Sequence, residues 1–173
     1  FSRLLREAEA VFTKNDYDER ESFGRGGDMA AFLRRFWVRL NSDPFETLNS
    51  RLITHYRRLR HAELNYSLRN LQSFENYSKQ SGRLGIPQHE LSDLGAPVIW
   101  EHAVNLGFDP RGLLYIRFGA PDSMSITMLE RFPADSLQTW YYGMFPFSFQ
   151  RLGPDEDYVF RPSQYEKSLA DMI

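Results

Sequence analysis

Residues 139–152 read TWYYGMFPFSFQRL, and six of the ten residues from Trp140 to Phe149 are aromatic. Aromatic residues favour pleated, half-buried backbone, so we predict strands at Thr139–Met144 and Phe147–Leu152. Side chains alternate along a strand, which places Trp140 and Tyr142 on one face and Tyr141 on the other. Both faces of this sheet therefore need cover. Helices of this chain supply one cover, and the other is either more of this chain or a second protein.

Apolar runs between turns predict the remaining strands. Leu113–Phe118 is predicted to be a buried strand between turns at 109–112 and 119–122, with further strands at Ile126–Phe132 and Tyr158–Arg161. Before Gly107 the apolar spacing is helical instead. Helices followed by short strands predict an α+β fold, with N-terminal helices packed against a small C-terminal antiparallel β-sheet.

Apolar positions three and four residues apart predict the helices of this N-terminal part. Asp28 is suited to cap one of them, and Asp43-Pro44 should end it. Polar residues at 15–28 and 73–94 predict loops. The expected helices are Leu4–Phe12, Asp28–Leu40, Thr47–Leu71 and Pro97–Asn105.

Composition excludes several classes of function. The 173 residues include 42% hydrophobic residues and carry a formal charge of −2, as expected of one ordinary domain. Eight basic and four acidic residues between Asp28 and Arg69 are too few for the basic stripe of a nucleic-acid binder. The chain has no cysteine, and His55 and His61 lie six residues apart, on opposite sides of a helix. We therefore assign no catalytic, cofactor-binding or metal-binding residue, and no transmembrane segment.

An ordered string of motifs runs from Asp28 to Pro162. It comprises Phe36-Trp37, Asp43-Pro44, Asn49, Tyr56-Arg57-Arg58, Ala62, Asp109, Arg111-Gly112, Tyr115-Ile116-Arg117, Gly119, Pro121-Asp122 and Trp140-Tyr141-Tyr142. This string resembles the GWxTD domain of bacterial, often exported proteins, a family with no established activity. The motif that names the family is reduced here to Gly107-Phe108-Asp109-Pro110.

The resemblance implies a division of the chain and a location. Residues 1–27 would end an upstream helical region, 28–162 would form the GWxTD-like domain, and 163–173 would be a tail. Export to the periplasm or cell envelope is implied, with any signal or anchor outside these 173 residues; a cytoplasmic location stays open. A fainter similarity to BamE-type envelope lipoproteins, which are accessory subunits, rests on Gly119, Pro121, Asp122, Trp140 and Tyr142.

Asp109 and Arg111 are the most distinctive polar pair. Asp109 is suited to hold a turn through its own backbone, with Arg111 paired to a carboxylate such as Asp122 or to an acid from a helix. Alternatively, an exposed Arg111 binds an acidic group of a partner. The motif residues that we expect to shape this region are Asp43, Pro44, Asp109, Arg111, Gly112, Gly119, Pro121 and Asp122.

We expect a non-catalytic protein-interaction domain, an accessory or scaffolding subunit of an envelope- or membrane-associated bacterial complex. The alternative is a small-ligand binder or hydrolytic enzyme with a polar cleft around Asp109, Arg111, Asp122 and His102. A carbohydrate binder that uses exposed aromatic residues is a third possibility. Aromatic and arginine side chains suit protein interfaces. The candidate interface residues are Arg57, Arg58, Trp140, Tyr141, Tyr142, Phe145, Phe147 and Phe149.

Overall fold

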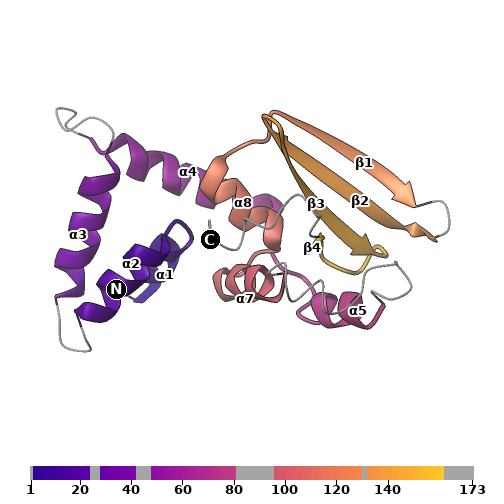
Figure 1. The fold of residues 1–173 in the computed structure, drawn as a ribbon, viewed down its shortest axis with the longest axis horizontal. Helices are drawn as coiled ribbons and strands as arrows, with labels where there is room; N and C mark the ends of the chain where they lie inside the picture. Colours follow the sequence, from indigo (N-terminus) through magenta and orange to yellow (C-terminus); the bar gives the residue numbers. More distant parts are fainter. Residues whose placement is uncertain (1, 24–27, 42–47, 81–95, 130–131, 162–173) are drawn as a thin grey trace.

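The computed structural model describes residues 2–23, 28–41, 48–80, 96–129 and 132–161. Helices fill the first two thirds of the chain and strands follow them (Figure 1). The helices are α1 (Ser2–Glu9), α2 (Lys14–Ser22), α3 (Met29–Leu40), α4 (Ser50–Asn65), α5 (Ser73–Gln80), α7 (Ala96–Leu106) and α8 (Pro110–Phe118). The strands are β1 (Ser123–Leu129), β2 (Phe132–Tyr142), β3 (Phe145–Leu152) and β4 (Val159–Arg161).

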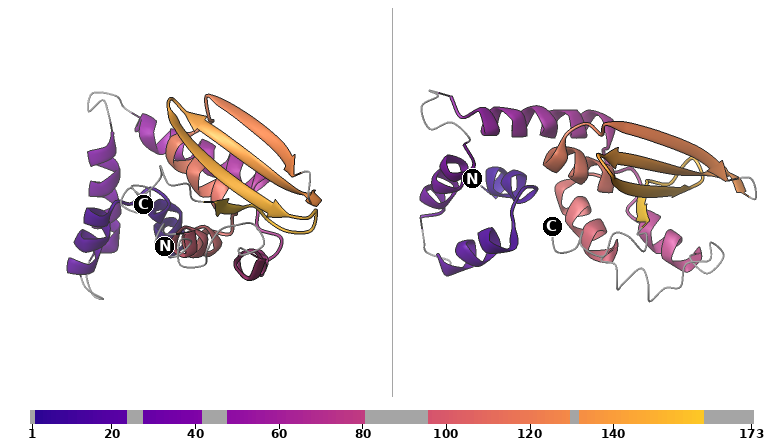
Figure 2. Two further views of the ribbon diagram at one scale, coloured as in Figure 1. Left: turned by 45° about the vertical axis from the view of Figure 1, so that its right-hand side comes forward. Right: turned by 45° about the horizontal axis from the view of Figure 1, so that its top comes forward.

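The fold is α+β, as predicted. The four strands form one antiparallel sheet in the order β1-β2-β3-β4, so β1 lies at an edge. Helices α7 and α8 lie between this sheet and the N-terminal helices, and α4 runs from α3 to α8 (Figures 1 and 2). The sheet extends past the helices at its β1 side.

Two apolar clusters stabilise the molecule. The larger joins the inner face of the sheet to α4, α5, α7 and α8, and Trp140 lies within it with 1% of its surface exposed. The smaller joins α1, α2 and α3 around Phe12, Phe32 and Phe36. The Phe12 ring makes edge contacts with the rings of Phe32 and Phe36, at centroid distances of 5.7 Å and 4.7 Å. The first three helices therefore share a core across the expected boundary at residue 27.

Side-chain caps explain where α3 and α4 begin. The Asp28 carboxylate accepts hydrogen bonds from the amides of Ala30 and Ala31, which confirms the predicted cap of α3. The Asn49 side chain accepts from the Leu52 amide at the start of α4 and donates to the Trp37 carbonyl of α3. Asn49 therefore joins α4 to α3.

The predicted strand at Leu113–Phe118 is wrong, because these residues form α8. Asp109 caps this helix by accepting from the Arg111 amide, and Pro110 occupies its first turn. A short apolar run does not distinguish a buried helix from a buried strand by periodicity alone. Leu113, Leu114 and Ile116 are buried, so α8 lacks the polar face that would have revealed its helical period.

Two further helices lie where we expected loops. Helix α2 occupies part of 15–28, and its start is fixed by the Asp16 carboxylate, which accepts from the amide and the hydroxyl of Thr13. Helix α5 occupies the beginning of 73–94. Conversely, α4 ends at Asn65, six residues before the expected end. Asp43 and Pro44 lie outside the described residues.

The strands are close to prediction but are displaced along the chain. The expected strand at Ile126–Phe132 corresponds to β1 and the first residue of β2, and Thr139–Met144 overlaps only the second half of β2. The prediction of Phe147–Leu152 falls within β3, and that of Tyr158–Arg161 agrees with β4 to one residue.

Candidate functional site

Asp109 and Arg111 form a buried ion pair. The Arg111 Nη2 atom lies 2.5 Å from Asp109 Oδ2, and its Nη1 donates to Gln138 Oε1 of β2 at 3.0 Å. The guanidinium also lies over the Tyr158 ring, 3.9 Å from its centroid. Burial raises the pKa of Asp109, and the adjacent Arg111 charge opposes this shift. The pair therefore joins α8 to the sheet, and Arg111 is not presented to a partner.

The residues of the alternative enzyme hypothesis do not converge. Asp122, which we expected to pair with Arg111, instead accepts from the Gly143 amide at 2.6 Å. His102 contacts the Tyr17 hydroxyl, 3.3 Å from its Nε2 atom, and burial lowers its pKa. Within the described ranges, no group of three His, Asp or Glu side chains could hold a metal ion. The structure therefore assembles no polar cleft from Asp109, Arg111, Asp122 and His102.

Gly112 and Gly119, the two glycines among the motif residues, lie close to atoms of other side chains. A Cβ atom on Gly112 would lie 2.7 Å from the Phe108 Cβ atom, so only glycine fits between α8 and Phe108. Gly119 ends α8 with φ +89°, and a Cβ atom there would lie 2.7 Å from Arg58 Nη2. The Tyr142 hydroxyl donates to the Gly119 carbonyl at 2.8 Å. Pro121 follows, partly buried, in the short segment that leads to β1.

Arg58 is turned toward the protein interior and not toward a partner. Its Nη1 atom donates to the carbonyls of Arg117 at 2.8 Å and Ile116 at 3.3 Å. These carbonyls belong to the last turn of α8, whose oxygens lack partners within the helix. Arg58 therefore stabilises the end of α8. Its neighbour Arg57 remains exposed.

Replacing Gly119 with alanine should lower the free energy of unfolding, and Gly107→Ala provides the matched control. Both glycines have positive φ, but a Cβ atom on Gly107 meets nothing within 4 Å. We expect a loss of about 1–3 kcal/mol from backbone strain in both variants. Gly119→Ala should lose a further amount of about 1–2 kcal/mol, since it displaces Arg58 from its carbonyls. Equal losses in urea denaturation would contradict this role of Arg58.

Most of the aromatic strip is covered by this chain. Trp140, Phe147 and Phe149 are buried in the larger core, and the Trp140 ring contacts Tyr66 and Phe149. These three residues are therefore unavailable to a partner, contrary to our expectation. Tyr142 is partly buried, whereas Tyr141 is 36% exposed and Phe145 is 66% exposed.

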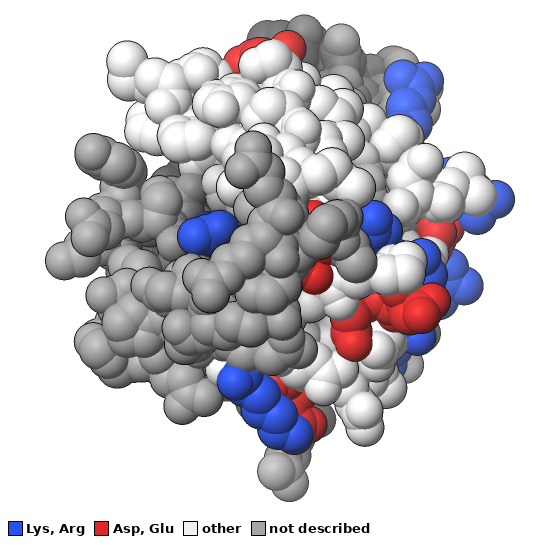
Figure 3. Space-filling model, turned by 90° about the vertical axis from the view of Figure 1, so that its right-hand side faces the viewer, with Lys and Arg blue, Asp and Glu red and all other residues white. Residues whose placement is uncertain are grey.

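The most exposed apolar row of the sheet lies on β1, outside the candidate interface residues predicted from the sequence. Met124, Ile126 and Met128 are 59%, 60% and 60% exposed. They pair with Trp140, Gln138 and Ser136, which are buried, so the row continues the inner face of the sheet beyond the helices. The upper half of Figure 3, where the sheet lies, is mostly uncharged. Alternation of Met and Ile with Ser and Thr in SMSITML is the sequence signal for this row.

Comparisons of the chain with protein-family models, with curated proteins and with solved structures found no match. Among the described helices, none is long and apolar enough to cross a membrane.

Proposed function

We propose that this chain is a non-catalytic protein-interaction domain that binds an extended segment of a partner at the β1 edge. The observation that carries this proposal is the exposure of every residue from Ser123 to Met128 on a strand that, among the described strands, pairs with β2 alone. The free edge of such a strand presents unpaired amides and carbonyls that can add a further strand.

The chemistry of the edge favours a strand with apolar residues at every second position. Edge strands are usually protected by charged residues, proline or a cover, yet SMSITML contains neither charge nor proline. A partner strand would continue the antiparallel sheet and place its apolar side chains beside Met124, Ile126 and Met128. Main-chain hydrogen bonds would supply affinity, and this apolar row would supply specificity.

The resemblance to the GWxTD domain supports a host complex at the bacterial envelope, in which this chain would be an accessory or scaffolding subunit. That relationship and that location remain predictions. For the enzyme alternative, the described residues offer no assembled polar cleft, because Asp109 and Arg111 are occupied with each other and Asp122 binds the Gly143 amide.

Placing a charged side chain on one face of β1 tests the proposal. Random nine-residue peptides displayed on phage would be selected on the purified chain, and the enriched peptides measured by fluorescence anisotropy. We expect sequences with alternating apolar residues. Ile126→Lys should weaken their binding at least tenfold, about 1.4 kcal/mol, because it places a charge in the apolar row. Thr127→Lys, on the opposite face of the same strand, is the matched control and should bind normally.

Amide exchange distinguishes strand addition from other contacts. Bound peptide should slow hydrogen exchange of the β1 amides that point away from β2, while amides of α4 stay unchanged. Equal loss of binding in both lysine variants, or no enriched peptide with an alternating pattern, would contradict the proposal. A wild-type dimer that becomes monomeric with Ile126→Lys would show instead that the edge binds a second copy.

A further inference from the structure

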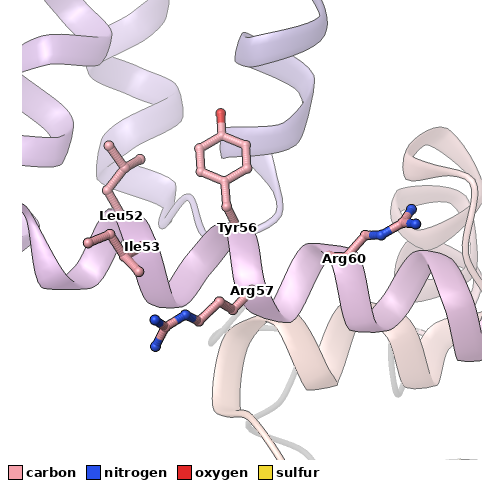
Figure 4. A pocket seen from close by; sticks show the side chains of 5 residues that line it. All are labelled: Leu52, Ile53, Tyr56, Arg57 and Arg60. Carbon is pink, nitrogen blue, oxygen red and sulfur yellow. The ribbon is translucent and has the colours of Figure 1, made fainter.

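A groove along α4 is a second feature that the β1 edge does not explain. Two adjoining depressions, of about 570 Å³ and 320 Å³, share Tyr56 and Arg60. The first is lined by Leu52, Ile53, Tyr56, Arg57 and Arg60, and Figure 4 shows these side chains along one side of the helix. The second continues toward α1, where Arg3 lies beside the carboxylates of Glu7 and Glu63. From Leu52 to Glu63 the groove follows α4 for about 16 Å, at 1.5 Å per residue.

The charge of this groove is positive where its floor is most apolar. Helix α4 contains Arg51, Arg57, Arg58 and Arg60 before its first acidic residue, Glu63. Arg58 binds the end of α8, and Arg60 lies 3.2 Å from Glu63 across an exposed pair. Within the described part of the chain, no hydrogen bond or ion pair occupies Arg57. Two arginines therefore line the first depression and no carboxylate does.

From this apolar floor and arginine rim we infer that the α4 groove binds an amphipathic, acidic helical segment of a partner protein. Apolar residues on one face of such a helix would pack on Leu52, Ile53 and Tyr56, as in other helix-in-groove complexes. A carboxylate on its flank would accept two hydrogen bonds from the Arg57 fork. The groove is elongated and open, whereas sites for small molecules enclose most of the ligand surface. About three turns of helix would fill its length.

A designed peptide tests this inference without knowledge of the natural partner. The probe is a fluorescent 14-residue helical peptide with leucine at positions i, i+3, i+4 and i+7 and glutamate on the flanks. A control peptide has lysine in place of each glutamate. By fluorescence anisotropy we expect the acidic peptide to bind at least tenfold more tightly than the basic one. The preference should diminish as salt rises, because exposed charges are screened.

Three variants locate the binding site. Arg57→Glu and Ile53→Ser should each weaken binding of the acidic peptide at least tenfold. Arg34→Glu makes the same charge change on an exposed face of α3 and should leave binding unchanged. Ile126→Lys should also leave it unchanged, so failure of the β1 proposal and failure of this one are separable. Circular dichroism would establish that each variant is folded.

Two results would overturn the inference. One is equal binding of the acidic and basic peptides, or of wild type and Arg57→Glu. The other is binding of the chain to vesicles of anionic phospholipid, lost with Arg57→Glu, when the acidic peptide does not bind. The second result would show that the groove contacts a membrane surface.

Discussion

Replacing Arg111 with alanine should lower the free energy of unfolding by about 3–5 kcal/mol, since the Asp109 carboxylate would then be buried without its counter-ion. Asp109 is almost completely buried, and its pKa is already raised by desolvation, so Arg111 is the main group that stabilises its charge. Loss of Arg111 also removes the hydrogen bond to Gln138 and the contact with the Tyr158 ring. Urea denaturation at pH 7 measures the loss.

Asp109→Asn and the double variant Asp109→Asn, Arg111→Ala complete this experiment. The double variant should be more stable than Arg111→Ala, because neither charge is then left buried alone. Additive losses would show that the two side chains act independently. If Arg111→Ala were as stable as wild type and lost only peptide binding, Arg111 would be an interface residue, which was the alternative from the sequence.

The class of the fold follows from the sequence because helical and strand periods occupy separate parts of the chain. Periodicity did not identify the helix at Leu113–Phe118, where we predicted a strand. Helix α8 is covered by α4, α7 and the sheet, and a helix covered on most sides has no polar face to reveal its period. Only Asp109-Pro110 signalled its start, and these residues fit a turn equally well.

Helix α2 was not predicted from the sequence for the opposite reason. Its sequence KNDYDERES is polar on every side, so no apolar stripe marks it, and its cap involves Thr13 and Asp16 alone. Such a helix depends on capping and on contacts with its neighbours. One such contact joins Tyr17 to Phe12, with ring centroids 5.4 Å apart, and the sequence alone does not reveal it.

The sequence also does not reveal which side chains of the sheet are exposed. An aromatic strip predicts a sheet with two faces to cover, but it does not say which side chains the helices reach. The helices cover Trp140, Phe147 and Phe149 and stop before β1, which leaves Met124, Ile126 and Met128 exposed. Likewise, the adjacent Arg57 and Arg58 are indistinguishable in sequence, and the position of α8 alone decides that Arg58 is bound internally.

Acidification should destabilise this protein through His55 before most of its carboxylates titrate. The His55 ring contacts the rings of Trp37 and Tyr56, with centroids 4.9 Å and 5.3 Å away. Its pKa is about 4 in the folded chain, against 6.5 for an unperturbed histidine, because burial and the charges of Arg51 and Arg58 disfavour the protonated ring. The unfolded chain therefore binds more protons than the folded chain between these two values.

The sign and the size of the effect follow from that difference. Stability contributed by neutral His55 is fully present above pH 6.5 and is lost progressively as the pH falls toward 4. The shift corresponds to about 3 kcal/mol, at 1.36 kcal/mol per pH unit. Urea denaturation at several pH values should show this loss in wild type. His55→Phe, which keeps an aromatic ring, should flatten the curve, and subtraction of the two curves removes the contribution of the carboxylates.

His102→Phe is the comparison that isolates His55. Burial also lowers the pKa of His102, so this variant should flatten the curve as well, while the contribution of His55 remains. If His55→Phe left the slope between pH 6.5 and 4 unchanged, the His55 ring would have to be solvated or paired in the folded state.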